Sequence, residues 1–224
     1  IQQQSDSLGS LFVIAHPGRE TGPNCTGCGW SADSTNYDLL EVVEIVNGTN
    51  VENEIAGIPF WHELLNKGFR ITGIGGSDDH AGGFGSTQPG TPTTVVWADG
   101  LSEKSLIDGV KSGKVYIKTK KSSDPDISFY AERNDERFEM GHVIKIENPS
   151  SPITFTLITD PQDNLIAEWI INGETVGNME MPEYLENGQI RYNYVLEKPE
   201  PGWFRLNLRR NGEITTITNP IYLN

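Results

Sequence analysis

The chain has few of the residues that metal sites and anionic partners require. Its 224 residues include four histidines and two cysteines, and 17 basic side chains stand against 31 acidic ones, for a formal net charge of −14. Nucleic acids and anionic membranes are bound through clustered Lys and Arg, which this balance disfavours. No apolar run approaches the roughly 18 residues that span a bilayer. We therefore expect no nucleic-acid partner and no membrane-spanning segment.

The sequence also lacks a recognisable start. It begins at Ile1, without a Met and without a basic and apolar leader, so we expect a processed form or a fragment. Cys25 and Cys28 have the spacing of half a zinc site, but no second such pair accompanies them. A short disulfide in an exported protein and two free thiols are the alternatives that we favour. Localisation is unknown from the sequence, with a lean toward the periplasm or the cell exterior.

Residues 1–121 alternate apolar runs with helical patterns. The runs at 11–15 and 39–46 indicate buried strands that end in turn residues. Residues 58–67 carry an apolar stripe typical of a helix, and residues 69–74 return to strand character. Such alternation predicts βα units with a parallel sheet, and so an α/β fold.

Residues 122–224 have a different sequence pattern, with about seven short strand candidates and little helical periodicity. Asn-Gly steps occur at 172–173, 187–188 and 211–212, and two of them, placed between alternating segments, predict tight hairpins. Length and pattern fit a β-sandwich of roughly 100 residues. We place the domain boundary between residues 121 and 122.

Two of the strands in the first half are followed directly by candidate metal ligands. His16 follows the first apolar run, and Asp78 and His80 follow the strand that ends near Gly75. The carboxyl ends of parallel strands share one edge, where α/β proteins place their sites. A carboxylate and imidazoles suit Zn²⁺, Mn²⁺ or Fe²⁺. Asp79 points the other way if the segment is extended, which makes it a weaker candidate.

Several segments resemble the metal-dependent hydrolases of the PHP (polymerase and histidinol phosphatase) family. Ile14–Pro17, Leu40–Gly48 and Ile74–His80 are similar to motifs in the C-terminal half of that domain. Gly90–Trp97 resembles its end in the CehA/McbA-like branch. Thr218–Tyr222 resembles the last strand of the Ig-like domain that follows it in many members.

The resemblance implies that residues 1–121 are the C-terminal portion of a distorted (β/α)₇ PHP barrel, a TIM-like fold, followed by an Ig-like β-sandwich over 122–224. It also implies up to three divalent metals (Zn, Mn or Fe), with His16, Asp78 and His80 as ligands. The implied function is a metal-dependent hydrolase, most simply a phosphoesterase, in which a metal-activated water attacks a small phosphorylated or ester substrate.

The family's other motifs, an early HxH and a TDH-type segment among them, do not occur in this sequence. We therefore expect that the chain lacks the N-terminal half of the site, binds divalent metal weakly and is inactive when isolated. A homo-oligomer or complementation by the missing barrel half would complete it. His62 and His142 are expected to be structural or surface histidines.

Two further features bear on the site. Arg19 lies in a glycine-rich segment after His16 and is a candidate substrate-binding residue, because a guanidinium suits an anion. Glu41 and Glu44 lie three apart in one strand, so at most one of them faces a site, and a salt bridge explains them equally well.

The alternative function is a non-catalytic surface or carbohydrate-binding protein in which the β-sandwich makes the contact. Aromatic side chains of the second half would then form a sugar platform, although core or cross-strand packing is the simpler explanation for them. These residues are Tyr184, Tyr192, Tyr194 and Trp203.

Overall fold

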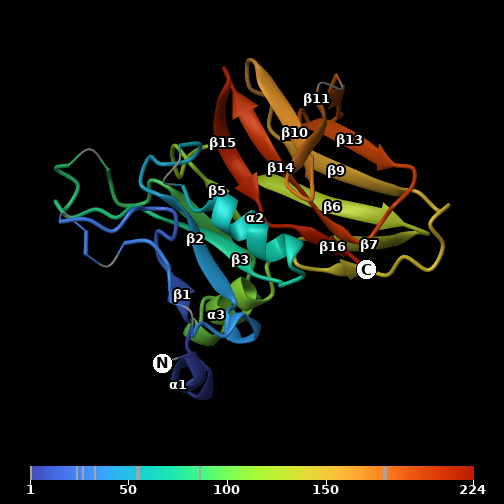
Figure 1. Cartoon of the computed structure of the whole chain (residues 1–224). Coiled ribbons are helices and arrows are strands. Elements are labelled where there is room, and N and C mark those ends of the chain that lie inside the picture. Colours follow the sequence, from blue (N-terminus) through green and yellow to red (C-terminus); the bar gives the residue numbers. More distant parts are fainter. Residues whose placement is uncertain are drawn as a thin grey trace. The chain divides into compact units, whose positions relative to one another are not determined.

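The chain divides into two compact units, Ile1–Ser122 and Ser123–Asn224 (Figure 1). The expected boundary lies one residue before this division. Strands make up 38% of the residues and helices 12%. The computed structural model describes residues 2–23, 25–26, 28–32, 34–53, 56–85, 87–178 and 181–224.

The first unit contains a three-stranded parallel sheet in the order β1-β2-β3 (Figure 1). Its strands are β1 (Val13–Ile14), β2 (Val42–Asn47) and β3 (Thr72–Gly76). Ile14 pairs with Val43 in the register of β1 and β2. The β-branched residues of β2 are buried, as expected for a parallel strand that is covered on both faces.

Helix α2 (Ile58–Asn66) connects β2 to β3 and buries one face. Trp61, Leu64 and Leu65 form this apolar face, all with less than 5% of their surface exposed. The indole N–H of Trp61 donates to the carbonyl of Ile71 at 2.7 Å, at the entrance to β3. The helix predicted from the stripe at 58–67 is therefore confirmed.

The remaining elements of the first unit are short. They are α1 (Gln2–Ser7), the 3₁₀ turn η1 (Tyr37–Leu39), β4 (Thr93–Val96), α3 (Glu103–Lys111) and β5 (Val115–Lys118). β4 and β5 pair antiparallel, although α3 lies between them in sequence.

The predicted α/β class and its barrel portion are wrong. A TIM-like barrel repeats a parallel strand and a helix around a closed ring. Among the described residues of the first unit, one βαβ connection occurs, through α2, and the last two strands run antiparallel. The protein is mostly β, with several sheets and helices of at most nine residues. None of the helices in the described ranges is long and apolar enough to cross a membrane.

The second unit is built from strands alone in its described residues. One sheet has the order β12-β13-β9-β6-β7, and another has the order β11-β10-β14-β15, with β16 paired to β14 and β8 paired to β16. The strands are β6 (Ile127–Arg133), β7 (Glu136–Glu139), β8 (Val143–Ile144), β9 (Ile153–Thr159), β10 (Leu165–Ile171), β11 (Glu174–Asn178), β12 (Glu183–Tyr184), β13 (Ile190–Leu196), β14 (Gly202–Arg210), β15 (Glu213–Thr218) and β16 (Ile221–Leu223).

Aromatic rings join these two sheets. Phe155 of β9 stacks on Phe204 of β14 with a centroid distance of 3.5 Å and an interplanar angle of 8°. Trp169 of β10 lies 5.9 Å from Phe204. All three rings are buried, so they form the core of the second unit.

Candidate functional site

His16 lies two residues after the end of β1, at the carboxyl edge of the parallel sheet. Its φ angle of 35° is in the left-handed region, which few residues other than glycine adopt. The backbone N–H of His16 donates to Oε2 of Glu44 at 2.7 Å. The sheet therefore places this histidine through a hydrogen bond to the neighbouring strand β2.

Asp78 and His80 lie after β3, at the same edge of the sheet. Asp78 also has a positive φ, of 50°. Its Oδ1 lies 3.0 Å from Nε2 of His80, and its Oδ2 accepts from Nη1 of Arg19 at 3.3 Å. Asp78 thus contacts an imidazole on one oxygen and a guanidinium on the other, and its side chain is 30% exposed against 85% for His80.

One cavity of about 520 Å³ brings the four residues predicted for the site together. It is lined by His16, Arg19, Asp78 and His80. The loop that carries Cys25 contributes the remaining wall, together with Glu20. Arg19 and Asp78, which are 59 positions apart in the sequence, therefore face the same space.

Glu44 is the charged residue of β2 that belongs to this site. Its Oε2 accepts from the His16 backbone and, at 3.3 Å, from Nδ2 of Asn47. Burial raises the pKa of the Glu44 carboxyl, and the two hydrogen bonds act against this increase. Glu41 instead pairs with Lys111 at 2.7 Å. The sequence left open which of the two glutamates faces the site. The structure shows that Glu44 contacts His16 and that Glu41 forms a salt bridge.

Gly76 of β3 makes room for the Glu44 carboxylate. A Cβ atom at this position would lie 2.4 Å from Oε1 of Glu44, which is closer than any real contact. Gly76 therefore leaves the space that the Glu44 carboxylate occupies.

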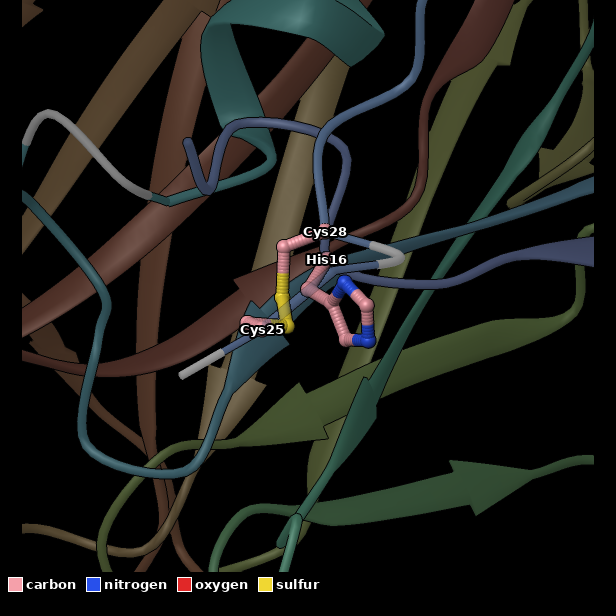
Figure 2. A group of neighbouring side chains, drawn as sticks. All are labelled: His16, Cys25 and Cys28. Carbon is pink, nitrogen blue, oxygen red and sulfur yellow. A yellow bond between two sulfur atoms is a disulfide. The ribbon is translucent and has the colours of Figure 1, made fainter. Parts of the chain in front are cut away.

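His16 also belongs to a second group of donor atoms, with Cys25 and Cys28 (Figure 2). One ring nitrogen of His16 and the two sulfur atoms lie within 4.8 Å of one another, a spacing at which three side chains could hold a metal ion. The two cysteines form a disulfide. Asp78 and His80 are not members of this group.

The Nδ1 atom of His16 is buried and makes no hydrogen bond to any described residue. A buried imidazole nitrogen normally has a partner, because leaving it unpaired costs the free energy of its desolvation. The lone pair of this nitrogen is therefore available to bind a metal ion.

The other sequence candidates have structural roles. The Asp79 carboxylate accepts from the backbone N–H groups of Ala81 and Gly83 at 2.9 and 2.7 Å, so it stabilises the turn. His62 lies in α2, beside Trp61. Nδ1 of His142 accepts from the backbone of Glu139, in the second unit.

Comparison with known proteins gives no family for this chain, since no family model, curated protein or solved structure matches it. The resemblance to the PHP hydrolases accordingly stays a prediction, carried by the motifs quoted for it.

Proposed function

We propose that the first unit carries the site of a metal-dependent hydrolase that acts on a phosphoester. The observation that supports this most directly is the shared cavity: the three predicted metal ligands His16, Asp78 and His80 and the predicted substrate-binding residue Arg19 line one space. The site lies at the carboxyl edge of a parallel sheet, where ligands bind in many unrelated folds.

The types of donor present suit a divalent ion. In the described part of the chain, however, the only group of three such residues with donor atoms within 4.8 Å of one another is His16, Cys25 and Cys28, so His16 would have to approach Asp78 and His80 when the ion binds. The donor set of His16, Asp78 and His80 is one carboxylate and two imidazoles, which Zn²⁺ and Mn²⁺ accept. Nδ1 of His16 is buried without a partner among the described residues, as a ligand atom would be before its ion binds. His16, Asp78 and His80 would hold the ion, which, when bound, lowers the pKa of a coordinated water and polarises a phosphoryl oxygen.

Arg19 supplies the second component of the proposed chemistry. Its guanidinium already binds one carboxylate oxygen of Asp78, which places a fixed positive charge at the wall of the cavity. A planar guanidinium can bind two oxygens of a phosphate at once. Arg19 therefore orients the substrate, while Glu44 holds the backbone of His16 in place.

The proposal is tested with the oxidised full chain after removal of metal by a chelator. Mn²⁺ or Zn²⁺ binding is measured by calorimetry, and hydrolysis is measured with p-nitrophenyl phosphate and bis(p-nitrophenyl) phosphate. We expect weak metal binding that Asp78→Asn abolishes. Because the chain supplies only part of the implied ligand set, any hydrolysis should be slow, dependent on metal and lower still in Asp78→Asn and Arg19→Ala. His62→Gln is the matched histidine control. Metal binding and turnover unaffected by Asp78→Asn would contradict the proposal.

The carbohydrate-binding alternative has less support. A sugar platform needs exposed rings, but Tyr192 and Trp203 are 4% and 1% exposed. Tyr194 packs against Trp169 with a centroid distance of 5.9 Å. Tyr184 is exposed, but a single ring does not make a platform.

A further inference from the structure

The donor atoms of His16, Cys25 and Cys28 form a group that the proposed hydrolytic site does not use as a whole (Figure 2). The two sulfur atoms are joined as a disulfide, and a disulfide offers no thiolate to a metal. We propose that reduction of this disulfide creates a Zn²⁺ site whose ligands are the two cysteine thiolates and the His16 imidazole.

The geometry requires small movements only. Tetrahedral Zn²⁺ with Zn–S bonds of about 2.3 Å holds two sulfur atoms about 3.8 Å apart. In a disulfide the sulfur atoms are about 2 Å apart, so each has to move by roughly 1 Å. The Cα atoms of Cys25 and Cys28 are 5.4 Å apart, and side-chain rotation can provide this change without moving them.

Hydrogen bonds hold the loop closed independently of the disulfide. Gly22 and Cys25 exchange two backbone hydrogen bonds, of 3.1 and 3.0 Å, and the N–H of Cys28 donates to the Cys25 carbonyl at 3.4 Å. The hydroxyl of Thr21 donates to the carbonyl of Cys28. Reduction therefore leaves the two thiols adjacent to each other and to His16.

The surroundings favour a bound ion. Cys28 is 1% exposed, which shields a metal–sulfur bond from water. The His16 backbone is fixed by Glu44, and its Nδ1 has no hydrogen-bond partner among the described residues. Thiolate and imidazole are the ligands that select Zn²⁺ over Mg²⁺ or Mn²⁺. With three protein ligands, water takes the fourth position.

The chemistry balances with a dithiol as the reductant. The dithiol gives two electrons and two protons to the disulfide and becomes a disulfide itself, while Cys25 and Cys28 become thiols. Binding of Zn²⁺ then displaces the two thiol protons, so about two protons are released for each ion bound.

The experiment compares oxidised chain with chain that has been reduced by dithiothreitol and desalted without oxygen. Zn²⁺ is titrated against a chromophoric chelator, and Co²⁺ serves as a spectroscopic probe. We expect the reduced chain to bind one Zn²⁺ at least about tenfold more tightly than the oxidised chain. Thiolate-to-cobalt charge-transfer absorption should appear in the reduced chain and not in the oxidised one.

Variants assign the ligands. Cys25→Ser/Cys28→Ser should remove the effect of the reductant, and His16→Asn, which tolerates a positive φ, should weaken Zn²⁺ binding at least about tenfold while cobalt–thiolate absorption remains. Equal Zn²⁺ affinity in both redox states, or His16→Asn binding as tightly as the parent, would overturn the proposal. Asp78→Asn should leave this reduced site unchanged, whereas it abolishes the metal binding proposed for the oxidised chain, so the two proposals can fail separately.

Discussion

The backbone N–H of His16 donates to Oε2 of Glu44 at 2.7 Å, and this bond joins the loop after β1 to the interior of β2. The same carboxylate accepts from Asn47. Glu44 acts through His16 in this arrangement, which makes it a positioning residue. Burial raises the pKa of the Glu44 carboxyl, and the hydrogen bonds from His16 and Asn47 oppose this increase.

Glu44→Ala should weaken Mn²⁺ or Zn²⁺ binding to the oxidised chain by about 10- to 100-fold, the usual effect of losing a group that orients a metal ligand. The measurement is a calorimetric titration of each variant. Glu41→Ala is the matched control, because that carboxylate lies on the same segment of chain and pairs with Lys111. Equal losses in both variants, or none in Glu44→Ala, would contradict a positioning role.

Gly76→Ala should reproduce the effect of Glu44→Ala. The added Cβ would lie 2.4 Å from Oε1 of Glu44, so the carboxylate has to leave its position beside His16. The double variant should lose little more than either single variant, because both remove one interaction. Gly100→Ala, which places its Cβ in ordinary contact 3.8 Å from Ser105, is the control. Additive losses in the double variant would show that the two residues act independently.

Local features of the chain were predictable from its sequence. Ser102 precedes α3 and its hydroxyl accepts from the Ser105 N–H, as expected of a cap residue. Asn172-Gly173 and Asn211-Gly212 form the tight hairpin turns expected of them, and both asparagines have positive φ. Such signals depend on a few neighbouring residues, which is why sequence patterns identify them.

The arrangement of strands was not predictable in the same way. A short apolar run such as Val115–Lys118 has the same sequence pattern in a parallel and in an antiparallel strand. It pairs antiparallel with β4, which is incompatible with the predicted parallel barrel. The ion pair of Arg19 with Asp78 joins residues 59 positions apart, so only the fold could show it. The disulfide was one of two alternatives left open for Cys25 and Cys28, since spacing alone does not set redox state.

Glu168→Ala should destabilise the second unit by about 3 kcal/mol. Oε2 of Glu168 accepts from Nδ2 of Asn207 at 2.7 Å and from Nε of Arg209 at 3.1 Å. Burial lowers the pKa of Arg205 to about 9, and the negative charge of Glu168 opposes that decrease, so its removal leaves buried positive charge less compensated. Glu183→Ala, in an exposed ion pair, should cost about 0–1 kcal/mol in urea unfolding. Similar losses in the two variants would contradict this prediction.

Tyr192→Phe should change how stability depends on pH. The Tyr192 hydroxyl donates to the carbonyl of Leu165 at 3.0 Å. Burial, and to a smaller extent Tyr184, raise the pKa of Tyr192 above the usual value of 10.0. The unfolded chain therefore ionises first, so the hydroxyl contributes stability that is fully present below about pH 10 and is lost as the pH rises through the raised pKa. Tyr192→Phe should be less stable by about 1 kcal/mol near pH 8, and this difference should shrink near pH 10.5, as measured by urea unfolding.

Tyr184→Phe is the control, because its ring is exposed, and it should cost little stability near pH 8. A Tyr192→Phe difference that stays constant across this range would show that the hydroxyl ionises equally in the folded and unfolded chains.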